Sequence, residues 1–343
     1  MKKYNVAILG ATGAVGQEFL KLIEERNFPF NELKLLASER SAGKTIAFMG
    51  KDYIVEEATP DSFNGVQIAL FAGGSISKTL APEAAKRGAV VIDNSSAFRM
   101  DPEVPLVVPE VNPEAIKNHK GIIANPNCST IIMVMALKPV HDAAKIKRIV
   151  VSTYQAVSGA GKEGIDELTD QVKSVVENRP VEANILPSAS LPKHYQIAFN
   201  LLPQIDVFVE DDYTKEEMKM VNETHKIFND YNIGITATTV RVPVYRSHSE
   251  SINIELNGPL SSEEAKQVLS KFPGVIVQDN PAEMLYPMPL YTSDSNEVFV
   301  GRIRADKTVP YGLNMWVVGD QIRKGAALNA LQIAEYMIEH NLI

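Results

Sequence analysis

The only cysteine of the chain lies in a polar segment that could carry nucleophilic chemistry. This segment, NPNCST, runs from Asn125 to Thr130, and the apolar residues after it, as far as Leu137, have helical spacing. A cysteine at the start of a helix faces the positive end of the helix dipole, which lowers the pKa of its thiol. Most free cysteines are buried structural residues, but the polar neighbours of Cys128 favour a reactive one. A nucleophile also needs a base, and the sequence alone does not choose among the histidines at positions 119, 141, 194, 225, 248 and 340.

A glycine-rich segment near the N-terminus has the spacing of a dinucleotide-binding turn. Gly10, Gly13 and Gly16 form a G-x-x-G-x-x-G pattern between an apolar run at 5–9 and a helical pattern at 14–26. Glycines let the backbone turn tightly and approach a pyrophosphate, whose charge is stabilised by a helix N-terminus. A turn that serves only strand–helix packing is the alternative. The strand–turn–helix context favours cofactor binding.

The residues after the second apolar run bear on which dinucleotide binds. That run is followed by Ser38, Glu39, Arg40 and Ser41. A carboxylate at this position would bind the ribose 2′-hydroxyl of NAD, whereas a guanidinium between two hydroxyls suits the 2′-phosphate of NADP. Glu39 therefore leaves NAD open as an alternative, and we predict NADP.

Several charged residues are candidates for binding anionic groups. Arg99 follows an apolar run, at the place where doubly wound sheets bind ligands. Glu216 and Lys219 share one face of a predicted helix, where the simplest interpretation is a weak solvated ion pair. Arg241 and His248 would face opposite sides of one continuous strand, so a bulge or bend would be needed to bring them together.

The first third of the chain alternates between strand and helix patterns, which predicts a parallel, doubly wound sheet of Rossmann type. Asn112 suits the N-cap and Pro113 the first position of one of these helices. The apolar β runs are 5–9, 33–37, 66–71, 89–93 and 121–124, and the helical patterns are 14–26, 78–87 and 113–118.

The character of the sequence changes after residue 128. Runs rich in Val, Ile and Thr predict a second domain of α+β type with a mixed or antiparallel sheet, and a capping box at 214–217 opens one of its helices. The chain from 322 on has the pattern of one amphipathic helix. We expect an NADP-binding domain over 1–127, with the helix at about 322–343 packing back onto it, and a catalytic domain over 128–321. The predicted strands are 146–155, 235–245, 251–256, 298–304 and 313–318, and the other helices are 129–137 and 165–177.

Composition excludes several classes of protein. A length of 343 residues predicts two domains. Lys and Arg total 34 against 42 Asp and Glu, a net charge of −8 that argues against nucleic acid as a partner. One cysteine excludes an intramolecular disulfide and a zinc site of several thiolates, and we expect no metal. The longest apolar run, 131–137, is too short to span a membrane. We expect a cytoplasmic protein that binds small molecules.

Taken together, these segments resemble the aspartate-semialdehyde dehydrogenase family along the whole chain. The resemblance is carried by VAILGATGAVG, SERSAGK, SSAFRM, NPNCSTI, TYQAVSGAG, EEMK, RVPVYRSHSE and GDQIRKGAALNA, of which NPNCSTI and the Arg–His segment are specific to the family. It implies reversible reduction of L-aspartyl-4-phosphate by NADPH to aspartate 4-semialdehyde and inorganic phosphate. This is a step toward lysine through diaminopimelate, methionine, threonine and isoleucine. The resemblance also implies a homodimer formed through the second domain, or a dimer of dimers.

The resemblance assigns catalytic roles to four residues. Cys128 becomes an acyl-thioester, His248 accepts and donates a proton, Gln155 beside the cysteine orients the substrate, and Asn127 lies in the same loop. The chemistry is consistent with these residue types. A thiolate can displace phosphate from an acyl phosphate, and the thioester can accept hydride, so two moderate barriers replace one high barrier. A histidine with a pKa near 6.5 can transfer the proton.

The resemblance also implies how substrate and cofactor bind. Arg241 would hold the substrate α-carboxylate, Glu216 its amino group, and Arg99 with Lys219 the phosphate. The residues implied to contact NADP are Gly10, Thr12, Gly13, Ala14, Val15, Gly16, Ser38, Arg40, Ser41, Ser158, Gly159 and Gln321.

Other functions predict different residues. An N-acetyl-γ-glutamyl-phosphate reductase shares the cofactor and the thioester, but its substrate has a blocked amine and no use for Glu216. A phosphorylating glyceraldehyde-3-phosphate dehydrogenase has a different cysteine motif. A non-catalytic NADP sensor would have lost Cys128, Gln155 or His248, and a cysteine hydrolase would not need the glycine motif or Arg40.

Overall fold

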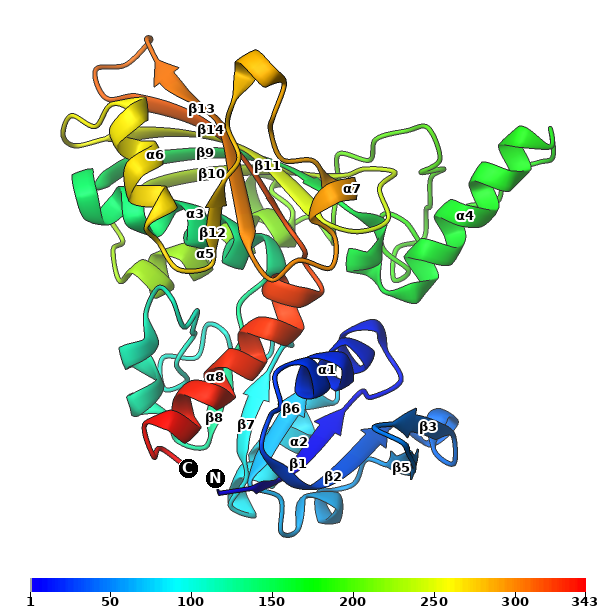
Figure 1. The fold of residues 1–343 in the computed structure, drawn as a ribbon. Coiled ribbons are helices and arrows are strands. Elements are labelled where there is room, and N and C mark those ends of the chain that lie inside the picture. Colours follow the sequence, from blue (N-terminus) through cyan, green and yellow to red (C-terminus); the bar gives the residue numbers. More distant parts are fainter. Residues whose placement is uncertain (1) are drawn as a thin grey trace. The chain divides into compact units, whose positions relative to one another are not determined.

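The computed structural model describes residues 2–343 and divides the chain into two compact units (Figure 1). The first unit contains the residues up to Asn127 together with Ala326–Ile343, and the second unit is Cys128–Gly325. No helix within the described residues is long and apolar enough to cross a membrane.

The first unit contains a parallel sheet with strand order β5-β2-β1-β6-β7-β8. Successive residues of β1 point to opposite faces, as the pleat requires. Val6 and Ile8 join the core formed with α1 and α8, whereas Ala7 and Leu9 join the core formed with α2. The predicted doubly wound fold is therefore confirmed. The strands are β1 Tyr4–Leu9, β2 Phe30–Ala37, β5 Glu56–Glu57, β6 Ile68–Phe71, β7 Val90–Asp93 and β8 Ile122–Ala124, the helices are α1 Ala14–Glu25, α2 Ser77–Lys86 and α8 Leu328–Glu339, and a hairpin is formed by β3 Thr45–Phe48 and β4 Lys51–Ile54.

The segment after Asn112 differs in part from its prediction. Pro113–Asn118 forms a 3-10 helix, and the Asn112 side chain does not cap it. The Asn112 Oδ1 accepts the Val108 N–H at 2.9 Å, and its Nδ2 donates to the Leu106 carbonyl at 2.9 Å. The predicted bounds, the N-cap position of Asn112 and the first position of Pro113 are confirmed, but the Asn112 side chain makes no capping hydrogen bond because the preceding loop uses both of its polar atoms.

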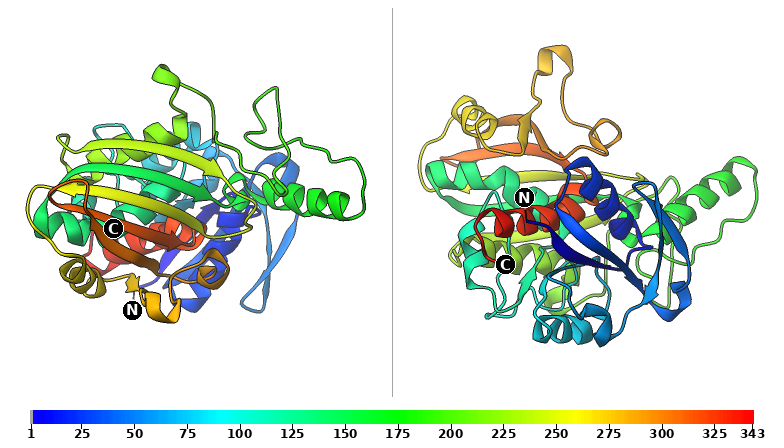
Figure 2. Two further views of the ribbon diagram at one scale, coloured as in Figure 1. Left: turned by 90° about the horizontal axis from the view of Figure 1, so that it is seen from above. Right: turned by 60° about the horizontal axis from the view of Figure 1, so that its bottom comes forward.

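The second unit contains a mixed sheet with strand order β10-β9-β11-β14-β13-β12. The pairs β9–β10 and β12–β13 are parallel, and the remaining pairs are antiparallel. Helices α3, α5 and α6 pack against the sheet, and in the left view of Figure 2 its strands lie in front of α3 and α5. The strands are β9 Ile146–Gln155, β10 Gly234–Arg241, β11 His248–Leu256, β12 Val275–Val277, β13 Val298–Asp306 and β14 Gly312–Gly319, and the helices are α3 Cys128–Ala144, α4 Lys162–Val176, α5 Lys215–Phe228, α6 Ser262–Ser270 and α7 Pro289–Thr292.

Two boundaries in the second half of the chain were predicted wrongly. The predicted strand at 235–245 ends at Arg241, because the chain turns away at Val242 although the apolar run continues. Arg241 and His248 therefore belong to two strands joined by a turn at 242–247, which is the bend that the prediction required. The predicted C-terminal helix is interrupted, since Arg323–Ala327 forms a π-helix before α8 begins.

Candidate active site

Cys128 is the first residue of α3, so its side chain lies at the positive end of a helix of 17 residues. Its Sγ atom lies 3.4 Å from Nε2 of His248. The residue packed against this cysteine is Gly325, where a side chain would not fit, because a Cβ there would lie only 3.0 Å from the Cys128 Cβ. The helix dipole favours a thiolate at this position, and the structure selects His248 from the histidines as its neighbour.

Three strand ends meet beside the cysteine. Arg241, the last residue of β10, pairs with Gln155, the last residue of β9, and β11 starts at His248. The Thr153 hydroxyl donates to the Gln155 Oε1 at 3.0 Å, which fixes the orientation of the amide. The Gln155 Nε2 therefore faces the other side, where it donates to Glu216 at 3.2 Å and lies 3.5 Å from the His248 Nε2. The two strands that flank β9 thus place a cation and an imidazole on either side of one amide.

The imidazole of His248 is fully buried, and its other nitrogen is also engaged. Its Nδ1 accepts the Ala156 backbone N–H at 3.0 Å. Burial, reinforced by the nearby charge of Arg241 and opposed by Glu216, lowers the pKa of His248 to about 3. This pKa lies below the value near 6.5 expected from the sequence, because burial disfavours the charged form of the ring.

Arg241 is a buried cation with donors to spare. Only 4% of the residue is exposed, and its Nη1 donates to the Ala156 carbonyl at 2.7 Å. Its Nε has no partner among the residues that the structure describes. Burial lowers the pKa of Arg241, and the charges of Glu216 and Cys128 oppose this shift. A guanidinium with unused donors in a buried site is suited to bind a carboxylate.

Glu216 and Lys219 form an ion pair in which the glutamate is buried and the lysine half-buried, so it is not the solvated surface pair of the simplest interpretation. Lys219 Nζ lies 2.9 Å from Glu216 Oε2 and 3.1 Å from Asp206 Oδ2. Burial opposes the charge of Lys219, but the two carboxylates outweigh it and raise the pKa. Asp206 was missed by the sequence analysis, because it stands alone in an irregular segment with no pattern to mark it.

Ser158, Gly159 and Gln321 lie around the turn that precedes His248. The Ser158 hydroxyl donates to the Tyr245 carbonyl, and the Gln321 amide donates to the Ser158 hydroxyl. The Gln321 Oε1 accepts the Ser247 N–H at 2.9 Å. A Cβ at Gly159 would lie 2.6 Å from the Arg241 Nη1, so this glycine leaves the space that the guanidinium fills.

Asp320 is a second anchor of the same turn that sequence reasoning missed. Its buried carboxylate accepts the Arg246 Nε–H at 2.6 Å and the N–H groups of Asp294, Ile322 and Arg323 at 2.7 to 3.0 Å. It therefore connects Arg246, two residues before His248, to Arg323 at the start of the π-helix. The signal was the Gly-Asp-Gln sequence within GDQIRKGAALNA, in which only the glutamine was given a role.

The glycine motif of the first unit fits a dinucleotide. Gly10 adopts a φ of +82°, and a Cβ at Gly16 would lie 2.2 Å from the Gly10 carbonyl oxygen. Gly13 caps α1 without any side-chain hydrogen bond, so the first-turn N–H groups are not covered by a capping side chain. Close backbone approach and a helix N-terminus are the two features that bind a pyrophosphate. Thr12, Ala14 and Val15 lie in the same turn and first helical turn.

The predicted specificity residues follow β2. Ser38, Arg40 and Ser41 lie at a 3-10 turn that spans Glu39–Ser41, and Arg40 and Glu39 are both exposed. Arg40 forms no ion pair with any residue in the described part of the chain, so its guanidinium is available to a ligand. Arg99 also belongs to the first unit, where its Nη2 donates to the Asn94 carbonyl at 2.8 Å.

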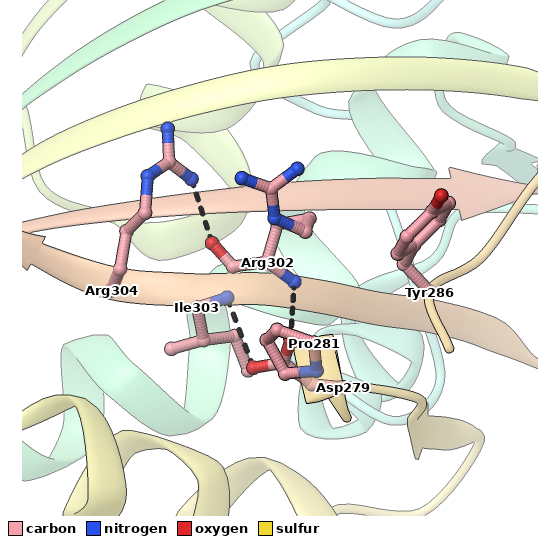
Figure 3. A pocket seen from close by; sticks show the side chains of 6 residues that line it. All are labelled: Asp279, Pro281, Tyr286, Arg302, Ile303 and Arg304. Atoms are coloured by element: carbon pink, nitrogen blue, oxygen red, sulfur yellow. Dashed lines mark hydrogen bonds between the residues drawn. The ribbon is translucent and has the colours of Figure 1, made fainter. Parts of the chain in front are cut away.

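A cavity of about 290 Å³ elsewhere in the second unit contains none of the predicted site residues. The Asp279 carboxylate in it accepts the N–H groups of Arg302 and Ile303 (Figure 3). It also forms an ion pair with Lys266 at 3.0 Å. The cavity is lined by Asp279, Pro281, Tyr286, Arg302, Ile303 and Arg304.

Both units match models of known protein families. Residues 5–119 match the NAD binding domain of semialdehyde dehydrogenase, and residues 137–324 match the semialdehyde dehydrogenase dimerisation domain. The chain is 60% identical to the aspartate-semialdehyde dehydrogenase of Aquifex aeolicus and 53% identical to that of Bacillus subtilis. Each of these alignments covers 99% of both proteins.

Solved structures agree with this assignment. Aspartate semialdehyde dehydrogenase II from Vibrio cholerae, complexed with ASA, superimposes with a TM-score of 0.93 at 49% identity over 99% of each chain. Aspartate semialdehyde dehydrogenase from Candida albicans, solved with NADP, superimposes with a TM-score of 0.78 at 26% identity over 100% of each chain. The chain belongs to the aspartate-semialdehyde dehydrogenase family and is an NAD(P)-dependent oxidoreductase.

Proposed function

We propose that this enzyme reduces L-aspartyl-4-phosphate reversibly to L-aspartate 4-semialdehyde, with NADPH as the reductant and Cys128 as the covalent nucleophile. The observation that carries the proposal is the position of Cys128 at the start of α3, 3.4 Å from His248. A thiolate in that position attacks the acyl carbon, the C–O bond to phosphate breaks, and a thioester forms on the sulfur. NADPH, when bound, supplies the hydride that reduces this thioester.

The charged residues of the second unit match the groups of the substrate. Arg241 has unused donors for the α-carboxylate, and Glu216 provides a carboxylate for the amino group. Lys219, bonded to Glu216, is the cation of this cluster that we assign to the phosphate, together with Arg99. Gln155 donates to Glu216 and holds that carboxylate beside the imidazole, so it positions the acceptor for the amino group. Asn127, 6% exposed, directly precedes the nucleophile in the same loop.

The cofactor proposal rests on the first unit. The turn from Gly10 to Gly16 would hold the pyrophosphate on the N-terminus of α1, with Thr12 to Val15 against it. Arg40, exposed and flanked by Ser38 and Ser41, would bind the 2′-phosphate of NADP. We assign Ser158, Gly159 and Gln321 to the remaining cofactor contacts. The match to a dimerisation domain supports a homodimer formed through the second unit, with a dimer of dimers as its extension.

The product of this reaction is a precursor of lysine through diaminopimelate, methionine, threonine and isoleucine, and we place the enzyme in that biosynthesis, in the cytoplasm. The test is NADP⁺ reduction with aspartate semialdehyde, compared with N-acetylglutamate semialdehyde, with and without phosphate. We expect turnover only with the first aldehyde and only when phosphate is present. Turnover with the acetylated aldehyde instead would identify an N-acetyl-γ-glutamyl-phosphate reductase.

A single substitution tests the covalent step. Cys128→Ala should abolish turnover and leave NADPH affinity nearly unchanged, because the thiol is the nucleophile and the proposed cofactor contacts do not include it. Fluorescence titration measures the affinity. Appreciable turnover in this variant would refute the thioester mechanism.

A further inference from the structure

We propose that Asp320 is a positioning residue for His248, and that it acts by holding the turn from Val244 to Ser247 that leads into β11. The proposal rests on the proposed function, in which His248 accepts and donates the proton beside Cys128, as the family resemblance implies. The Asp320 carboxylate acts on the imidazole through the backbone of this turn.

The first half of the turn is held by the residues that follow β9. The Val157 N–H donates to the Val244 carbonyl at 2.9 Å, and the Ser158 hydroxyl donates to the Tyr245 carbonyl. Val157 is fully buried, and it lies only two residues after the end of β9. This half of the turn is therefore fixed to the sheet.

The second half of the turn is held by Asp320 and Gln321, which directly follow β14. The Arg246 Nε–H donates to the Asp320 carboxylate at 2.6 Å, and the Ser247 N–H donates to the Gln321 Oε1 at 2.9 Å. These bonds hold the two residues that immediately precede His248. Because β14 pairs with β11, the anchors and the imidazole are carried by adjacent strands.

Ser247 has a backbone conformation that serine disfavours. Its φ is +70°, in the left-handed region, and the residue is fully buried. Such a conformation persists only where the surrounding structure imposes it. The hydroxyls of Thr292 and Ser293 each lie 3.2 Å from the Ser247 Oγ, while Gln321 holds the N–H. The direction in which the chain enters β11 at His248 therefore depends on these contacts.

Asp320 connects this turn to the rest of the second unit. Its Oδ1 accepts the N–H groups of Ile322 and Arg323 at 2.9 and 3.0 Å. Its Oδ2 accepts the Asp294 N–H at 2.7 Å as well as the Arg246 Nε–H, and Arg246 also pairs with the Asp294 carboxylate at 2.8 Å. One oxygen of this fully buried carboxylate is thus bonded to the segment that follows it, and the other is bonded to the turn.

The position of the turn matters because His248 Nε2 lies 3.4 Å from the Cys128 Sγ. Proton transfer needs groups within hydrogen-bond reach, and a displacement of about 1 Å can reduce a rate about 100-fold. Loss of the Asp320 bond releases the residue two before His248, so the imidazole is placed less precisely. Arg241 is held separately, by its bond to the Ala156 carbonyl at 2.7 Å. The chemical step should therefore suffer more than substrate binding.

Asp320→Asn tests this role, and Asp279→Asn is the matched control. Asp279 is also a carboxylate of the second unit that accepts two backbone N–H groups and pairs with a cation, Lys266 at 3.0 Å. An amide has one acceptor oxygen, so each variant loses bonds on one side and should lose stability to a similar extent. In NADP⁺ reduction we expect kcat of Asp320→Asn to fall by about 10- to 100-fold, with KM for aspartate semialdehyde within about threefold of wild type. Asp279→Asn should keep both values near those of wild type. A wild-type kcat in Asp320→Asn, or the same loss of kcat in both variants, would overturn the proposal.

Arg246→Ala removes the same contact from the other side and leaves the backbone bonds of Asp320 in place. We expect its kcat to fall by about tenfold, and Asp320→Asn should then cost no more than about a further twofold in the double variant. A wild-type kcat in Arg246→Ala, or fully additive losses, would show that Asp320 does not act through the turn. This arm of the test holds even if Asp320→Asn alone does not fold.

A measurement without turnover separates this proposal from the proposed function. Cys128 is the only cysteine of the chain, so alkylation by iodoacetamide reports on it alone, and the pH dependence of the rate reports on the imidazole beside the sulfur. In Asp320→Asn and Arg246→Ala we expect the midpoint of this pH dependence to move from the wild-type value toward that of His248→Ala. In Asp279→Asn it should stay at the wild-type value. An unmoved midpoint in the first two variants would refute the positioning role, whereas the proposed function fails if wild-type enzyme does not oxidise aspartate semialdehyde.

Discussion

Gly159→Ala should impair substrate binding by Arg241, although Gly159 itself takes no part in the chemical step. The variant adds a single methyl group next to the guanidinium. The new Cβ would lie 2.6 Å from the Arg241 Nη1, well inside contact distance. The φ angle of Gly159 is not in the left-handed region, so alanine does not strain the backbone. The guanidinium has to move, and because Arg241 is only 4% exposed, its movement breaks the 2.7 Å bond from Nη1 to the Ala156 carbonyl.

The expected size follows from that one bond. A hydrogen bond from a charged group contributes about 1.5–3 kcal/mol, so kcat/KM for aspartate semialdehyde should fall by about 10- to 150-fold. Steady-state NADP⁺ reduction measures this change, and KM for NADP⁺ is measured separately because Gly159 is also a proposed cofactor contact. Gly258→Ala is the matched control, since its Cβ would meet nothing within 4 Å and its φ is also unstrained.

A double-mutant cycle distinguishes displacement of Arg241 from other damage. In an Arg241→Ala background the added methyl group has no guanidinium to displace, so Gly159→Ala should change kcat/KM by no more than about twofold. An unchanged kcat/KM in the single variant, or an additive loss in the double variant, would refute the steric argument. An effect confined to KM for NADP⁺ would instead support the predicted cofactor contact of Gly159.

Three further changes test other parts of the structure. Arg40→Ala should weaken NADPH binding by about 10- to 100-fold and leave NADH binding nearly unaffected, because only NADPH carries a 2′-phosphate. Fluorescence titration measures both affinities. Equal losses for the two cofactors would mean that Arg40 does not bind the 2′-phosphate. Glu250→Gln should raise the free energy of unfolding at pH 8 relative to wild type, because between pH 4.5 and its pKa, which burial raises, the folded wild type holds a proton that the unfolded chain has released. The gain should be about 1.4 kcal/mol for each pH unit between 4.5 and either the raised pKa or the assay pH, whichever is lower. A gain that persists below pH 4.5 in urea unfolding would contradict this origin. His248→Gln should reduce the loss of unfolding free energy that the wild type shows between pH 6.5 and about 3, where the unfolded histidine binds a proton that the folded one excludes. If the unfolding free energies of the two proteins change with pH in parallel, the folded ring is not held neutral.

The features that the sequence predicted well depend on neighbouring residues. The strand at 146–155 was predicted with its bounds, because its centre, Ile149 to Val151, is β-branched and a polar stretch follows the strand. The helix after NPN starts at Cys128, and the capping box forms as predicted, with the Glu217 carboxylate accepting the Thr214 N–H at 2.7 Å. Each of these follows from local backbone chemistry.

The features that were missed depend on contacts between distant segments. The choice of His248 among the histidines required the pairing of strands 93 residues apart, which spacing does not reveal. Asp206 gains its role only because the fold brings it to Lys219. The burial of Glu250 was also missed, although strand alternation places it on the same face as Ile252 and Ile254, because a carboxyl without a partner is not expected inside a sheet.

The direction of the strands explains why the site needs a mixed sheet. The carboxyl end of β9 supplies Gln155, and its parallel neighbour β10 brings its own carboxyl end, with Arg241, to the same edge. The other neighbour, β11, runs antiparallel and so brings its first residue, His248, to that edge. If β10 ran antiparallel to β9, Arg241 would lie at the opposite edge of the sheet. If β11 ran parallel to β9, His248 would lie at that opposite edge instead. The sequence left mixed and antiparallel sheets as alternatives, and only the mixed arrangement places the cation, the amide and the imidazole side by side. The position of Cys128 beside them follows from α3, which packs on the same sheet with Ile132 against Gly319 at the end of β14.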